Sequence, residues 1–170
     1  FFSKNFEMAN DAISKLESLF DQMDKNKLAH GDVAEMASHD IEFAGVTFRY
    51  EEGVDVLTDF SLRLESGKKY ALVGSSGSGK STIAKLISGF YPVSSGELKI
   101  GGVDISKYKR ETLEHEIAFV FQNAKLFKTS IYENVKIGRP DASREEVVKA
   151  LDLAMCGSIL DKFETREDTI

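Results

Sequence analysis

The sequence predicts an α/β fold, and three observations carry the prediction. Apolar and polar side chains alternate with a period of two in residues 46–50 and 60–64, as in half-buried β-strands. A short apolar run at 70–73 leads directly into a glycine-rich loop at 74–79. The residues after this loop carry apolar side chains at helical spacing. Strands, a glycine loop and a helix in this order indicate a mixed α/β domain.

The composition is that of one ordinary globular domain. The 170 residues are 42% hydrophobic and 29% charged. A formal net charge of −6 argues against nucleic acid as a partner, because a duplex-binding surface needs an excess of Lys and Arg. No run of 18 apolar residues is present, so these residues hold no membrane span, and no secretory signal is visible. The lone Cys156 is interpreted as a small apolar residue near a helix end.

The first 23 residues predict a helix with a single apolar stripe. Two interpretations stay open here: a helix docked on its own domain, or the tail of a longer helix that enters from elsewhere. Residues 24–40 are polar and without periodicity, which predicts a linker. Because the chain begins at Phe1 and not at Met, we expect an excerpt of a longer protein. The stripe consists of Phe6, Ala9, Ile13, Leu16, Phe20 and Met23.

The next elements are strands. The two alternating runs predict antiparallel neighbours joined through the turn at 51–53. Tyr70 to Val73 is apolar without alternation, as expected for a strand covered on both faces. The inward positions are Val46, Phe48 and Tyr50 in the first run and Phe60, Leu62 and Leu64 in the second.

Helices and further strands follow the glycine loop. Residues 81–90 predict a helix, and 98–100 with the Gly101-Gly102 turn predict a strand pair. A weaker helix is expected at 107–115, and a second apolar strand at 117–121. Ser143 and Glu146 form a capping-box pattern in front of another helix.

The glycine loop matches the pattern G-x-x-x-x-G-K-[ST] at every fixed position. Glycines let the backbone curl so that successive N–H groups point inward and form a nest for phosphate oxygens. The following helix adds the positive end of its dipole. Lys80 can then reach the β- and γ-phosphates, and the Ser81 hydroxyl is placed to ligate Mg²⁺. The alternative, a flexible Gly/Ser linker, does not place Lys-Ser-Thr at a helix start. The predicted nucleotide-binding residues here are Gly74, Ser75, Ser76, Gly77, Ser78, Gly79, Lys80, Ser81 and Thr82.

The residues around the loop resemble the ABC transporter ATP-binding domain, and more closely that of exporters in which this domain follows a transmembrane domain on one chain. The resemblance covers residues 41–170. Its most specific part is Gln122-Asn123-Ala124-Lys125-Leu126-Phe127, continued through Ser130-Ile131 and Asn134, which is similar to the exporter Q-loop. The stretch Val46-Thr47-Phe48-Arg49-Tyr50 resembles the family's opening strand, and Ser95-Gly96-Glu97-Leu98 its later hairpin.

The resemblance assigns roles to two residues outside the glycine loop. Tyr50 would be the aromatic residue that stacks on adenine; without the family it reads equally well as a strand tyrosine on the sheet surface. Gln122 would complete the Mg²⁺ shell or position water, together with Lys80 as the catalytic pair; without the family it reads as a solvated loop residue. Ser81 and Gln122 are thus the predicted Mg²⁺ ligands.

The resemblance also implies a function. It implies a P-loop core with parallel strands, an N-terminal antiparallel subdomain and a preceding helix, residues 1–23, at the end of the last transmembrane segment. ATP and Mg²⁺ are the expected cofactors, and ATP hydrolysis that drives transport is the expected activity of the intact protein. A second ATP-binding domain, in a homodimer or heterodimer, and the transmembrane domain of the same chain are the expected partners. The domain would lie on the cytoplasmic side of a cell membrane. A non-catalytic ATP-binding module and a soluble ABC ATPase without transport function are the alternatives.

Three hydrolysis elements of the family are missing from these 170 residues. There is no Asp-Glu after an apolar run, no Leu-Ser-Gly-Gly signature and no switch histidine. The three histidines, His30, His39 and His115, come without a metal-ligand spacing. We therefore expect truncation ahead of the signature, an incomplete domain that alone does not hydrolyse ATP, and apolar strands at 70–73 and 117–121 that lack parallel neighbours.

Overall fold

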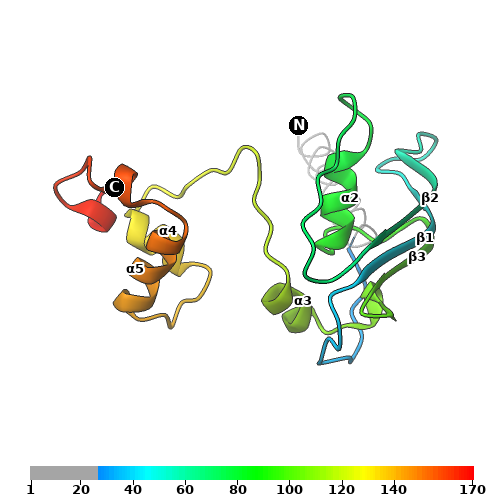
Figure 1. The fold of residues 1–170 in the computed structure, drawn as a ribbon, viewed down its shortest axis with the longest axis horizontal. Helices are drawn as coiled ribbons and strands as arrows, with labels where there is room; N and C mark the ends of the chain where they lie inside the picture. Colours follow the sequence, from blue (N-terminus) through cyan, green and yellow to red (C-terminus); the bar gives the residue numbers. More distant parts are fainter. Residues whose placement is uncertain (1–26) are drawn as a thin grey trace, which may run out of the picture. The chain divides into compact units, whose positions relative to one another are not determined.

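The computed structural model describes residues 27–170, and the helix predicted for 1–23 lies outside these residues. The chain divides into two units that meet in the sequence between Phe119 and Val120. The first unit holds one antiparallel sheet with helix α2 beside it, and the second is helical (Figure 1). Among residues 27–170, none of the helices combines the length and apolar character that a bilayer crossing requires.

The sheet of the first unit has the strand order β2-β1-β3-β4. Strand β1 (Ile41–Phe48) pairs antiparallel with β2 (Leu57–Leu64) on one side and with β3 (Ser95–Ile100) on the other. Phe43 lies opposite Leu62 and Val46 opposite Phe60, and the ladder is irregular between these two pairs, where β1 has one residue more than β2. The predicted antiparallel strands are therefore confirmed. Phe43 and Phe60 also meet edge to face, with ring centroids 5.5 Å apart.

Helix α2 (Lys80–Ile87) covers the sheet with its apolar side (Figure 1). Ile83 and Leu86, 5% and 0% exposed, belong to the same buried cluster as Phe43, Val46 and Phe48. Residues three apart lie on one helix face, so this pair buries together. Burial against the sheet thereby fixes the position of the first residue of α2, Lys80.

The remaining elements of the first unit follow α2. Strand β4 (Val103–Asp104) pairs with β3 through the Gly101-Gly102 turn, as predicted. A 3₁₀ turn, η1 (Ile105–Lys107), and helix α3 (Arg110–Glu116) come next, where the sequence predicted one weaker helix. The side chain of Asp104 accepts a hydrogen bond from the Ser106 N–H and so caps η1.

The described part of the segment predicted as a linker, residues 27–40, packs on this unit. The N–H groups of Gly31 and Val33 donate to the carbonyls of Tyr108 and Lys107, at 3.1 and 3.0 Å, and the Lys109 N–H donates to Val33 at 2.9 Å. A side chain at Gly31 would overlap the Lys107 backbone, so the two segments approach as only glycine allows. Tyr108 is fully buried, and its hydroxyl donates to the Ile100 carbonyl.

Two predicted strands are wrong. Residues 70–73 and 117–121 form no strand. Val73 and Val120 are 93% and 91% exposed. A strand exists through hydrogen bonds to a neighbour. Apart from one isolated bridge between Val33 and Tyr108, every strand pairing in the described residues is antiparallel, and the pairs are β1–β2, β1–β3 and β3–β4. The predicted parallel strands of the core are therefore not formed here, although both segments are apolar.

The second unit consists of α4 (Ile131–Lys136), α5 (Arg144–Leu153), α6 (Gly157–Leu160) and the 3₁₀ turn η2 (Arg166–Asp168). Its small core is formed by Ala142, Val147, Leu151 and Leu160. The predicted capping box is confirmed: Ser143 accepts from the Glu146 N–H, and the Glu146 carboxylate accepts from the Ser143 N–H at 2.9 Å.

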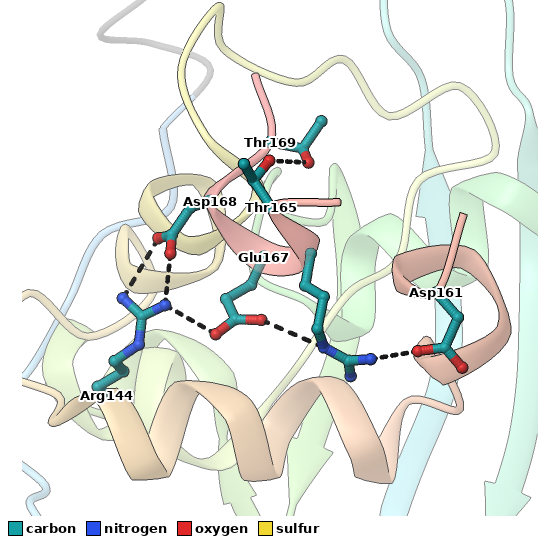
Figure 2. Close-up of polar contacts among 7 residues, drawn as sticks. Arg144, Asp161, Thr165, Glu167, Asp168 and Thr169 are labelled. Atoms are coloured by element: carbon teal, nitrogen blue, oxygen red, sulfur yellow. Dashed lines mark hydrogen bonds and ion pairs between the residues drawn. The ribbon is translucent and has the colours of Figure 1, made fainter. Parts of the chain in front are cut away.

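A polar network ties η2 to α5 in this unit (Figure 2). The guanidinium of Arg144 donates to both carboxylate oxygens of Asp168, at 3.2 and 2.6 Å, and to Glu167 at 2.8 Å. Arg166 forms ion pairs with Asp161 and Glu167. Two-pronged Arg–carboxylate geometry orients the groups as well as attracting them. The charges of η2 therefore hold it against the start of α5.

Candidate functional site

The glycine loop has the backbone geometry that the sequence pattern predicted. Gly77 and Gly79 have φ angles of +80° and +84°, a region that residues with a side chain rarely adopt. A Cβ atom at Gly79 would lie 2.9 Å from the Leu57 Cδ2 atom. Gly79 is also the N-cap of α2, and it offers no side chain to the first N–H groups of that helix. The loop therefore presents backbone donors at the positive end of α2.

Lys80 reaches back into this loop. Its Nζ atom donates to the carbonyls of Gly74 at 2.9 Å and Ser75 at 2.5 Å, and to the Ser78 hydroxyl at 3.1 Å. The side chain is thus anchored over the loop and not extended into solvent. Three loop oxygens holding one ammonium mark the point where an anionic group would meet both the cation and the backbone donors.

Ser81 and Thr82 occupy the next positions of α2. Ser81 is exposed, whereas Thr82 is only 5% exposed. A pocket of about 200 Å³ is lined by the loop and by the start of α2, together with Val56. Val56 directly precedes β2, and no motif in the sequence indicated it. It reaches the loop because its neighbour Leu57 lies against Gly79. The pocket lining is Val56, Gly77, Ser78, Gly79, Lys80, Ser81 and Thr82.

Tyr50 lies beside the same helix. Its hydroxyl is 3.2 Å from the Thr82 Oγ1 atom, and the Lys85 Nζ atom lies over its ring at 5.4 Å from the centroid. The ring is 39% exposed and meets Phe48 edge to face at 4.8 Å. The structure therefore brings the two predicted site residues Tyr50 and Thr82 into contact. The attraction between a cation and the face of an aromatic ring is about 0.5–1 kcal/mol at an exposed position.

Lys85 and Tyr91 were missed by the sequence analysis. Lys85 is three residues after Thr82 and so lies on the same face of α2, which the helical spacing alone could have indicated. Tyr91 follows the helix in an irregular segment, and its ring lies 5.2 Å from that of Tyr50. No spacing rule links positions 50 and 91, because their proximity depends on α2 packing against the sheet.

Gln122 belongs to the second unit. It lies in a turn at 122–123 and is exposed. The segment after it is organised by Asn134, whose side chain bonds the backbone of residues 127–130. Its predicted roles in Mg²⁺ binding and catalysis stay predictions.

Two of the histidines contact one carboxylate. The His39 Nε2 atom lies 2.9 Å from the Glu116 Oε2 atom, and the His115 Nδ1 atom lies 3.2 Å from the Oε1 atom. These hydrogen bonds, first from His39 and then from His115, hold the pKa of Glu116 below its ordinary value. The contact of His39 with Glu116 links the segment before β1 to the end of α3, and none of the three residues belongs to the glycine loop.

A glycine loop between a sheet and a helix, with its lysine folded back over the loop, defines a P-loop nucleotide-binding domain. Comparison with known proteins gives the family. The model of the ABC transporter family matches residues 57–167.

The chain is also similar to individual members of that family. It is 43% identical over 136 residues to the mitochondrial iron-sulfur clusters transporter ATM1 of Saccharomyces cerevisiae, covering 80% of this chain and 20% of the relative. It is 39% identical over 140 residues to the ATP-dependent lipid A-core flippase of Escherichia coli K12, covering 81% and 24%. A solved bacterial Atm1-family ABC exporter with ATP bound superposes with a TM-score of 0.79 at 28% identity, covering 94% of this chain and 29% of that one.

The chain belongs to the ABC transporter family, and it corresponds to the ATP-binding domain of an exporter. It spans about a fifth to a quarter of the length of the relatives named above.

Proposed function

We propose that this chain binds Mg²⁺-ATP at the glycine loop of residues 74–82. The observation that carries the proposal is the position of Lys80, whose ammonium group is held by three loop oxygens next to the N-terminus of α2. Positive charge, backbone donors and a helix dipole converge there, which is the combination that polyphosphates require. These donors and the pocket of about 200 Å³ beside them suit the triphosphate group of a nucleoside triphosphate.

Each residue of the site has one proposed task. Lys80 would exchange its loop oxygens for oxygens of the β- and γ-phosphates, and the N–H groups of 75–82 would hold the remaining ones. The exposed Ser81 hydroxyl would ligate Mg²⁺, which neutralises phosphate charge when bound, and for Gln122 a role toward Mg²⁺ is proposed from the family resemblance alone. Tyr50 would stack on adenine, and its exposed fraction of 39% leaves ring surface for that contact.

For the whole protein we propose ATP hydrolysis coupled to transport. Its partners would be a transmembrane domain of the same chain and a second ATP-binding domain, identical or different, and the domain would lie on the cytoplasmic side of the membrane. These proposals are supported by the family and by two relatives that are, by name, a transporter and an ATP-dependent flippase. Those relatives handle iron-sulfur clusters and lipid A, so a common cargo does not follow. We expect the 170 residues alone to bind ATP without hydrolysing it.

Calorimetric titration of ATP in the presence of Mg²⁺ tests the binding proposal. Lys80→Ala removes charge-assisted hydrogen bonds and is expected to raise the Kd by about 10- to 100-fold. Lys149→Ala, at an exposed position of α5 in the second unit, is the matched control and should leave the Kd unchanged. Equal ATP affinities of the wild type and Lys80→Ala would contradict the proposal that ATP binds at the glycine loop.

Steady-state turnover of the whole protein tests hydrolysis separately. Gln122→Ala should lower the turnover number and leave ATP affinity within about twofold, because Gln122 is proposed to act on Mg²⁺ and water and not on the base. Tight ATP binding without any turnover in the wild-type protein would instead favour the non-catalytic module.

A further inference from the structure

Three aromatic rings meet at the edge of the first unit. Phe48 is the last residue of β1 and is 2% exposed, Tyr50 is the most exposed of the three, and Tyr91 is half-buried. The centroid distances are 4.8 Å for Phe48–Tyr50, 5.2 Å for Tyr50–Tyr91 and 5.8 Å for Phe48–Tyr91. Each ring therefore touches both others.

The Tyr50 ring stands perpendicular to both neighbours. Its interplanar angles are 86° with Phe48 and 87° with Tyr91, the edge-to-face geometry that the ring quadrupole favours. Tyr50 lies two residues beyond the end of β1, so the sheet ladder does not orient its side chain. Contacts of the side chain itself must do so.

Three of the four described contacts on Tyr50 come from α2 and the segment that follows it. These are the Thr82 hydroxyl at 3.2 Å, the Lys85 ammonium at 5.4 Å and the Tyr91 ring at 5.2 Å. Thr82 and Lys85 lie in α2, which follows the glycine loop, whereas Tyr91 contacts the Tyr50 ring from a position beyond the end of this helix.

We infer that Tyr91 is a positioning residue of the nucleotide site, which fixes the Tyr50 ring in the orientation that receives the base. The inference rests on the proposed function, since it presumes that Tyr50 stacks on a base. Tyr91 itself needs no contact with the nucleotide. The Tyr91 ring restricts rotation of the Tyr50 ring. A base therefore meets a preorganised surface, and binding does not have to order the Tyr50 ring.

The competing explanation is that Tyr91 only fills space, because it also packs against the buried cluster of the first unit. The two explanations differ in what binding should sense. A positioning role concerns the base alone, whereas loss of packing under α2 would disturb the whole helix and with it the phosphate loop. ATP and inorganic tripolyphosphate separate these effects, because tripolyphosphate has no base.

The experiment titrates the purified protein with Mg²⁺-ATP and with Mg²⁺-tripolyphosphate. Tyr91→Leu keeps an apolar side chain but removes the aromatic ring, and Tyr91→Phe keeps the ring. For Tyr91→Leu we expect the Kd of ATP to rise about 2- to 10-fold, the range of one aromatic pair, with the Kd of tripolyphosphate unchanged. Tyr91→Phe should stay within about twofold of the wild type for both ligands.

Phe90→Leu is the matched control, because the Phe90 ring packs on Phe119, 5.2 Å away. It should leave both Kd values unchanged. An unaltered ATP affinity in Tyr91→Leu would overturn the inference, and so would a parallel loss of both affinities together with a lower Tm. If the wild type bound tripolyphosphate as tightly as ATP, the base would add no affinity, and only the positioning role of Tyr91 would be overturned. Binding of neither ligand by the wild type would overturn the proposed function, and this inference with it.

Discussion

The side chain of Asn134 holds both polar groups of the Phe127 backbone. Its Oδ1 atom accepts from the Phe127 N–H at 2.8 Å, and its Nδ2 atom donates to the Phe127 carbonyl at 3.1 Å. The same Nδ2 atom lies 2.9 Å from the Ser130 carbonyl and 3.3 Å from that of Thr129. One side chain on α4 therefore bonds three of the four residues that lead into this helix.

Asn134→Ala is expected to lower the free energy of unfolding by about 1–3 kcal/mol, since the Phe127 N–H and the Thr129 carbonyl lose the Asn134 side chain as their partner. Thermal and urea unfolding measure this change. Asn123→Ala, in the exposed turn at 122–123, is the control and should cost less than about 0.5 kcal/mol. Equal stabilities of the two variants would show that the bonds of Asn134 add nothing to the fold.

Stability of the second unit should depend on pH through the carboxylates that hold η2. A hydrogen bond from Arg144 lowers the pKa of Asp168 below its ordinary 3.8, and bonds from its own N–H and then from Arg144 lower the pKa of Glu167 below 4.5. A lowered pKa means that the ionised form is favoured by folding. This stabilisation is complete above the ordinary values and is lost as the pH falls through the lowered ones.

We therefore expect the Tm to be level above about pH 5 and to fall steadily as the pH decreases below about 4.5. Arg144→Met removes the main cation of the network and should flatten this decline, with a lower Tm at pH 7. Scanning calorimetry at several pH values provides the measurement. A decline in Arg144→Met as steep as in the wild type would assign the acid sensitivity to other groups.

Gly96 is expected to tolerate no side chain. Its φ angle is +82°, and a Cβ atom would overlap the backbone of Gly45, 2.6 Å from the carbonyl carbon. Gly96→Ala should thus cost about 2–4 kcal/mol of unfolding free energy, from strain and from the clash between β1 and β3. Gly53 has a φ of +95° but open space around it, so Gly53→Ala should cost only the strain, about 1–2 kcal/mol. Chemical denaturation of both variants compares these values, and the order of the two costs is the decisive result.

Tyr50 is expected to contribute through its ring and not through its hydroxyl. Tyr50→Leu should weaken ATP binding by about 5- to 100-fold, the range of one base–aromatic stack. Tyr50→Phe keeps the ring but loses the bond to Thr82, and it should remain within about threefold of the wild type. Calorimetric titration distinguishes the two. A large loss in Tyr50→Phe would instead make the Thr82 contact the dominant one.

Local patterns in the sequence predicted much of the fold. The alternation of apolar and polar residues is a property of each strand alone, and the antiparallel pairing of β1 and β2 that it predicted was confirmed. The capping box of Ser143 and Glu146 was confirmed for the same reason, since both partners lie within one helical turn. The glycine loop and Lys80 were found because their spacing is fixed by the chemistry of phosphate binding.

The predictions that were wrong depended on distant neighbours. Residues 70–73 and 117–121 have the apolar composition of buried strands, but composition does not supply the hydrogen-bonding partner that makes a strand. The contacts of Tyr50 with Lys85 and Tyr91 could not be predicted for a related reason. It forms where α2 meets the sheet, and the sequence pattern of neither element contains the other.

The docking of residues 27–40 on the first unit determines how a pull on the chain would be distributed. Tension applied at residue 27 would be carried by the buried side chain of Leu28 and by the backbone hydrogen bonds that join Gly31 and Val33 to residues 107–109. Strand β1 would be strained only after those bonds had separated. The part of the load carried by these hydrogen bonds would pass to Tyr108, whose buried hydroxyl donates to the carbonyl of Ile100, the last residue of β3.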